Sequence, residues 1–265
     1  MLGLVLTAAA ALAATLLASP APAEDTAARQ LGTRRVMVVS NNWAGTATIV
    51  DARSREVLTT INVVPDRDEE LQHVKTPSES HPAGAAYYYA IQQGVGEGHD
   101  QYVDDAFTTL DGKYLAVSRP SLRDVVWIDV AKAAAGGEAG DAGSIVAEAE
   151  MDGYRTDHMG LSPDGRRLVV SDSTARQVIE FSMVDETLPD GTQVAMGQRL
   201  RSFESGDTPH ENNYSADGKR IFHASIGRVY TPGDEGDSED GGGDTSKGDR
   251  WLQIVNDGSF EVKRR

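Results

Sequence analysis

Six residues that could bind a metal ion recur at a fixed interval along the sequence. They form three adjacent pairs, and each pair lies 53 residues from the next. The members of this six-residue cluster are Asp104, Asp105, Asp157, His158, His210 and Glu211. Imidazole and carboxylate groups together suit a divalent ion of the zinc or manganese kind. We therefore expect the cluster to bind a polar ligand, or a metal ion held by His158, His210, Asp157 and Glu211.

A second interpretation gives these side chains a purely structural role. Polar residues at the start of strands commonly bond to water and to the backbone, and the six could do no more than that. Two arginines, Arg119 and Arg176, are expected on the same side of the molecule and could bind an anionic ligand through paired hydrogen bonds. They could equally form ion pairs with nearby acids.

The spacing of the cluster is also the spacing of three Asp-Gly turns. Asp111-Gly112, Asp164-Gly165 and Asp217-Gly218 are 53 residues apart, and each is followed by a short apolar run that ends on a small residue. A fixed period of this length indicates one supersecondary unit used repeatedly. Equivalent positions of successive units then face one common region, which predicts that the six residues meet.

Each unit has the pattern of four short strands separated by Gly, Asp, Pro and Ser. We predict an all-β protein, a β-propeller of four-stranded antiparallel blades, with about four blades present. The expected blades are residues 34–64, 104–151, 157–204 and 210–265, and the first of them has only three strands. A β-sandwich is the alternative, but it does not explain the fixed period.

Two long segments interrupt the repeat. Residues 65–100 are predicted to form a helical insertion, with one helix over 66–74 and a second helix or lid over 83–93 that ends near Gly94. Residues 232–249 are an acidic, glycine-rich loop. If strands alternate in direction, the insertions 65–100 and 226–250 emerge on one face, and loops on a rigid scaffold commonly carry function.

The ends of the chain and its composition indicate where the protein acts. Residues 1–23 resemble a signal peptide, although no Lys or Arg precedes the apolar run, and 24–33 read as a linker. Secretion or a place in the cell envelope, with no membrane span after cleavage, is therefore expected. The chain has no cysteine, which excludes disulfides and thiolate ligands. Its net charge of −16 argues against nucleic acid as a partner.

Several of these motifs are similar to those of a known family. Val38-Val39-Ser40-Asn41, Thr208-Pro209-His210 and Leu161-Ser162-Pro163-Asp164-Gly165 resemble the blades of YVTN-repeat, YncE-like β-propellers. The resemblance implies an exported bacterial protein with a seven-bladed ring. The fifteen strands expected here are about half of what such a ring needs. A partial ring is therefore expected, either as a truncated product or as one completed by another copy.

Two functions remain open at this point. The first is an exported binding or scaffold protein, without catalysis, that takes a protein, a glycan or a small molecule on the face carrying the insertions. The absence of a nucleophile motif and the family resemblance favour it. The alternative is a metal-assisted, lactonase-like hydrolase that uses the six-residue cluster. No cofactor is expected beyond a divalent metal, and the fold cannot decide between the two functions.

Overall fold

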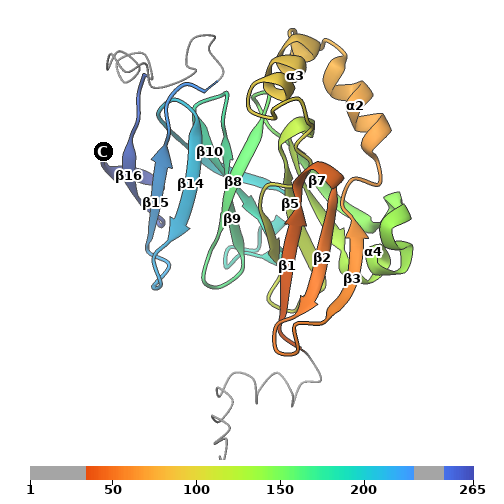
Figure 1. Ribbon diagram of the computed structural model, residues 1–265. Coiled ribbons are helices and arrows are strands. Elements are labelled where there is room, and N and C mark those ends of the chain that lie inside the picture. The colour runs from red at the N-terminus through yellow and green to blue at the C-terminus, as the bar shows by residue number, and fades with distance from the viewer. Residues whose placement is uncertain (1–33, 230–247) are drawn as a thin grey trace, which may run out of the picture.

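The computed structural model describes residues 34–229 and 248–265, and most of this part is β-structure (Figure 1). Four main antiparallel sheets follow one another along the chain, and each is built from strands that are consecutive or nearly so in sequence. A two-stranded hairpin forms a fifth sheet. The predicted signal peptide, the linker and residues 232–247 of the acidic loop lie outside the described residues.

The first sheet has three strands and the next three have four each. The strands of the first sheet are β1 (Val36–Asn41), β2 (Thr46–Asp51) and β3 (Val57–Asn62). Those of the second are β4 (Ala106–Thr108), β5 (Tyr114–Arg119), β6 (Asp124–Asp129) and β7 (Ile145–Glu150). Those of the third are β8 (Thr156–Leu161), β9 (Arg167–Asp172), β10 (Gln177–Ser182) and β13 (Arg199–Glu204). Those of the fourth are β14 (Pro209–Tyr214), β15 (Arg220–Ser225), β16 (Leu252–Asn256) and β17 (Glu261–Arg264).

Helices occupy the connections between strands. The insertion after the first sheet carries α2 (Arg67–Lys75) and α3 (Gly84–Gln93), which pack on each other at one end of the sheets (Figure 1). A third helix, α4 (Val130–Gly136), follows β6. Short 3₁₀ turns complete the connections: η1 (Asn42–Ala44), η2 (Pro120–Leu122), η3 (Gly137–Ala139) and η4 (Ala142–Ser144).

The Asp-Gly turns adopt one geometry in all three repeats. In the turn before β9, the Ser162 hydroxyl donates to Asp164 Oδ1 at 2.6 Å, and the same carboxylate oxygen accepts the Arg166 N–H at 3.1 Å. Gly165 has a φ of 70°, a left-handed conformation that glycine adopts without a steric penalty. The turns at Asp111 and Asp217 repeat these contacts. Local hydrogen bonding of Asp therefore starts the second strand of each repeated unit.

The core lies between successive sheets. Val38 and Ile49 of the first sheet pack against Leu115 and Val117 of the second. Two further apolar layers join the second sheet to the third and the third to the fourth. Since side chains alternate between the two faces of a strand, the middle two sheets bury both of their faces.

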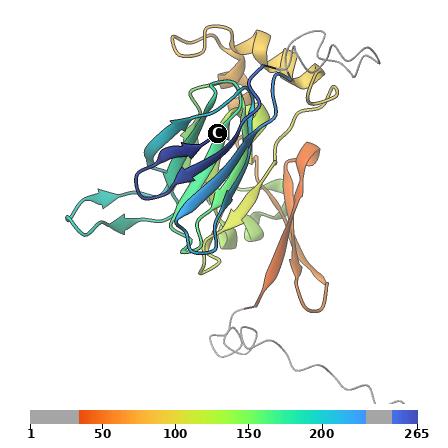
Figure 2. The ribbon, with the colours of Figure 1, turned by 90° about the vertical axis from the view of Figure 1, so that its left-hand side faces the viewer.

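These features confirm the predicted antiparallel all-β class, the three-stranded first unit and the helical insertion. None of the sheets is closed on itself, and the arrangement is compatible with a β-propeller-like fold. The hairpin of β11 (Glu186–Thr187) and β12 (Gln193–Val194), which projects from the sheets (Figure 2), and helix α4 were expected only as connections. Among the described residues, no helix is long and apolar enough to cross a membrane.

Candidate functional site

The structure brings the six-residue cluster together at one end of the first strands of the second, third and fourth sheets. Strands β8 and β14 pack side by side, and β5 contacts β8. In both β8 and β14 the pairing with the next strand is irregular at the cluster residues, between Thr156 and Met159 and between Pro209 and Glu211. Such bulges re-aim side chains and are common beside functional sites. The predicted convergence of the repeats is confirmed.

His158 lies at the centre of the cluster. Its Nδ1 is 3.4 Å from Asp105 Oδ2 and 3.8 Å from Glu211 Oε2, while its Nε2 is 3.8 Å from Asp157 Oδ1 and 4.0 Å from Asp104 Oδ2. Four carboxylates therefore surround one imidazole ring.

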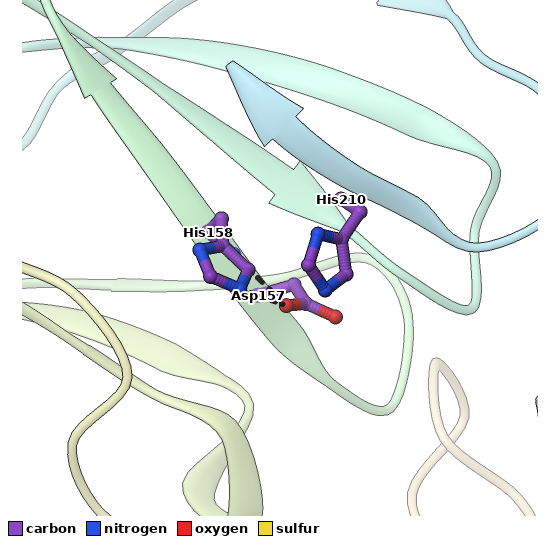
Figure 3. Close-up of side chains that lie close together, drawn as sticks. All are labelled: Asp157, His158 and His210. Carbon is purple, nitrogen blue, oxygen red and sulfur yellow. Dashed lines mark hydrogen bonds and ion pairs between the residues drawn. The ribbon is translucent and has the colours of Figure 1, made fainter. Parts of the chain in front are cut away.

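The second histidine completes a set of possible metal ligands. The rings of His158 and His210 have centroids 4.1 Å apart, and Asp157 lies beside both (Figure 3). One ligand atom from each of these three residues lies within 4.8 Å of the other two. Three nitrogen and oxygen donors at this separation can close around one small cation. Glu211, which the sequence also suggested as a ligand, is half-exposed and does not belong to this set.

Asp157 is the most firmly held member of the cluster. It is buried, accepts a hydrogen bond from the Ser173 hydroxyl at 2.6 Å and forms an ion pair with Arg155. Arg155 in turn contacts the side chain of Gln101. Arg155 carries no signal in the sequence, because no arginine occupies the equivalent place in the neighbouring repeats.

The environment separates the protonation of the two histidines. The hydrogen bond to Asp105 raises the pKa of His158 to about 9 despite burial, and Asp104 and Asp157 add to this effect. Burial lowers the pKa of His210 below its ordinary value, although Asp157 opposes the shift. Without a bound ion, His158 is therefore an imidazolium and His210 a neutral imidazole at pH 7.

The carboxylates are also divided. Burial, together with the neighbouring Asp157, raises the pKa of Asp104 to about 7. Burial acts in the same direction on Asp157, but Arg155 and Ser173 outweigh it, so the pKa of Asp157 is lowered. Asp104 Oδ2 is buried without a hydrogen-bond partner among the described residues. This oxygen is an acceptor without a hydrogen bond, 4.0 Å from His158 Nε2.

A buried network beneath the cluster fixes the two histidine backbones. The Asn212 side-chain amide donates to Ser171 Oγ at 2.9 Å and to the carbonyl oxygen of His158 at 3.2 Å. Ser171 in turn donates to the carbonyl oxygen of His210 at 2.8 Å. Asn212 Oδ1 lies 2.9 Å from Nδ1 of His223, a fully buried histidine of strand β15.

A groove of about 470 Å³ opens beside the cluster between β4, β8 and β14. Asp105, His158 and Glu211 line its polar side, and Phe107 and Leu161 contribute to its apolar side. A volume of this size is within the range of small-molecule sites. A ligand in the groove would contact the cluster directly.

The two arginines that could have bound an anion lie in other contacts. Arg119 is fully buried and pairs with Asp124 and with Asp66, whose Oδ1 is 2.6 Å from Arg119 Nη1. Arg176 pairs with Asp207 and Asp249. In the described part of the chain, neither forms a hydrogen bond or ion pair with the six-residue cluster. Both arginines therefore form ion pairs with acidic residues, which was the second of the two roles suggested for them.

No known protein family matches the sequence, and the curated proteins include no relative that matches it. The resemblance to YncE-like propellers therefore stays a prediction.

Proposed function

We propose that this chain is an exported β-propeller-like binding protein and that the six-residue cluster is its binding site for a divalent cation of the zinc or manganese kind. The observation that carries the proposal is the triad of Asp157, His158 and His210, whose ligand atoms lie within 4.8 Å of one another. Two imidazoles and a carboxylate form a donor set that such ions prefer over calcium.

The charge of the cluster supports a cation rather than an anion. Four carboxyl groups meet two histidines and one arginine there, and one buried carboxylate oxygen, Asp104 Oδ2, has no hydrogen-bond partner in the described part of the chain. Burial and the like charge of Asp157 both raise the pKa of Asp104. A bound cation would relieve this repulsion and satisfy the free oxygen.

The supporting shell suits a metal site as well. Asp157 is oriented by Ser173 and Arg155, and the backbones of both histidines are tied by Asn212 and Ser171. Outer contacts of this kind orient metal ligands and commonly change affinity by about 10–100-fold. In this site they would hold the three ligands before the ion arrives.

Titration calorimetry with zinc and manganese tests the proposal. We expect one ion per chain, with binding weakened by about 100-fold or more in His158→Ala and in His210→Ala, because each removes a direct ligand. His73→Ala is the matched control, since His73 is a half-exposed histidine of helix α2 outside the cluster. Absence of saturable binding, or equal losses in the control, would contradict the proposal.

A hydrolytic role is the second candidate, and the groove beside the cluster favours it. A bound zinc ion can supply a hydroxide near neutral pH, and the groove could place a lactone or ester next to it. Incubation of the zinc-loaded chain with simple lactones would show acid release that His158→Ala abolishes. Zinc binding without any turnover would leave the binding role alone.

A further inference from the structure

The two end sheets expose apolar faces that the middle sheets bury. In strand β5, Ala116 packs against the third sheet, and Val169 of β9 packs against the fourth. The next residue in this series, 53 positions on, is Phe222 of β15. The exposed fraction is 0% for Ala116 and Val169 but 40% for Phe222. In the fourth sheet, therefore, the residue at the position that packs against a following sheet is an apolar side chain that no further sheet covers.

The neighbouring strand repeats this difference. Val125 and Val178 lie opposite Ser118 and Ser171 in their sheets, and Leu252 lies opposite Ala224 at the same register. Both valines are fully buried, whereas Leu252 is 67% exposed.

The first sheet exposes the opposite kind of face. Strands β1 and β5 each have six residues and end on a three-residue 3₁₀ turn, so Met37 and Val39 correspond to Leu115 and Val117. Leu115 and Val117 are fully buried against the preceding sheet. Met37 and Val39 point away from the core that Val38 joins, and they are 46% and 47% exposed.

We propose that these two faces bind each other between two copies of this chain. The fourth sheet presents the face that packs on a following sheet, and the first presents the face that packs on a preceding sheet. Every internal interface of the molecule joins this same pair of faces. The two faces lie at opposite ends of the row of sheets (Figure 1), so each copy can use both at once.

The resulting assembly is a head-to-tail dimer. The fourth sheet of each copy contacts the first sheet of the other, so the two contacts are related by a two-fold axis and together close a ring. Two copies together carry eight of the main sheets, within the four to eight blades typical of propellers. Closure would cover the apolar faces of all four end sheets, which otherwise favour non-specific association. The proposal does not depend on metal binding, because none of its residues belongs to the six-residue cluster.

Disulfide trapping tests the orientation, because the chain has no cysteine of its own. Met37→Cys and Phe222→Cys are prepared separately with different tags, mixed and oxidised. We expect the mixed disulfide to dominate over either homodimer, since only a head-to-tail contact brings the two positions together. Ser54→Cys, on an exposed turn of the first sheet, is the matched control for Met37→Cys and should not cross-link with Phe222→Cys. Dominant homodimers, or equal yields with the control, would overturn the proposal.

Sedimentation analysis tests the stoichiometry on the unmodified chain. We expect the unmodified protein to have twice the mass of one chain. Leu252→Asp places a charge on the apolar face, and this variant should have the mass of one chain. Leu110→Asp is the control, because Leu110 is a leucine in a turn of the second sheet that is 75% exposed, slightly more than Leu252. A single-chain mass of the unmodified protein at every concentration would overturn the dimer, as would loss of the dimer in both variants.

Discussion

Two polar clusters of this molecule use the same residue types and differ in how completely their charges are paired. In the Arg119 cluster, formed by Arg119, Asp66 and Asp124, the guanidinium contacts both carboxylates and is fully buried. In the six-residue cluster, carboxylates are in excess, several members reach solvent, and Asp104 Oδ2 has no hydrogen-bond partner among the described residues. In the first arrangement the buried guanidinium is paired with both carboxylates. The second retains capacity for a ligand.

The largest effect is expected from breaking the Arg119 cluster. Arg119→Met keeps much of the side-chain volume but leaves Asp124 buried without its counter-charge. Removing one partner of a buried ion pair costs about 3–5 kcal/mol, which is a large part of the stability of most domains. Urea unfolding measures this loss, and metal affinity of the folded protein should stay unchanged.

Arg176→Met is the matched control for that experiment. Arg176 also pairs with two carboxylates, but its side chain is substantially exposed, and exposed ion pairs contribute about 0–1 kcal/mol. If the two variants lost equal stability, burial would not be what distinguishes the clusters.

A pH-dependent effect is expected from the histidine beneath the six-residue cluster. Burial lowers the pKa of His223 from 6.5 to about 4. Because the unfolded chain takes up the proton first, the contribution of neutral His223 is complete above pH 6.5 and is lost as the pH falls to 4. The difference corresponds to about 3 kcal/mol.

The comparison with His223→Gln isolates this contribution, since other groups titrate over the same range. Burial raises the pKa of Asp172 to about 6, which acts in the opposite direction on stability. We expect the unfolding free energy of the original chain, relative to the variant, to decrease steadily between pH 6.5 and pH 4. A constant difference across this range would show that His223 does not titrate as its burial requires.

A smaller effect is expected from the amide that supports the site. Asn212→Ala removes the hydrogen bonds to the His158 carbonyl oxygen and to Ser171. We expect a stability loss of about 1–3 kcal/mol from unpaired buried groups and a metal affinity reduced by about 10-fold through misplaced ligands. Ser205→Ala is the control, because Ser205 bonds to Nε2 of His223 but to neither backbone of the histidine pair. It should lower stability without changing metal affinity.

The sequence predicted the positions of the strands well because the signal was repeated. Three copies of one turn fixed the start of β5, β9 and β15 at intervals of 53 residues, and the turn geometry proved to be the same in each. Helix α4 and the β11–β12 hairpin had no such repetition. Each occurs once, in a connection whose composition does not distinguish a loop from a short element.

The same reasoning explains what was found and missed in the site. Spacing alone predicted that the six residues lie close together, because equivalent positions of stacked units face one region. Arg155 and Asn212 escaped notice, since they differ in type from the residues at equivalent places and act through hydrogen bonds that spacing does not reveal. Spacing did not reveal which acids pair with Arg119 and Arg176, because Asp66 and Asp249 lie more than 50 residues from the arginines that they contact.

The smallest effect is expected at the edge of the six-residue cluster and sharpens the comparison within it. Glu211 lies 3.8 Å from His158 Nδ1, and its side chain is half-exposed, so solvent screens its charge. Glu211→Gln should therefore change metal affinity less than about 3-fold and leave the unfolding free energy within about 0.5 kcal/mol of the original. Asp157→Asn alters a buried ligand that is held by Ser173 and Arg155. It should weaken binding far more in the same calorimetric titration. Equal losses in the two variants would mean that Glu211 coordinates the ion, and that exposure does not separate the ligands of this cluster from its rim.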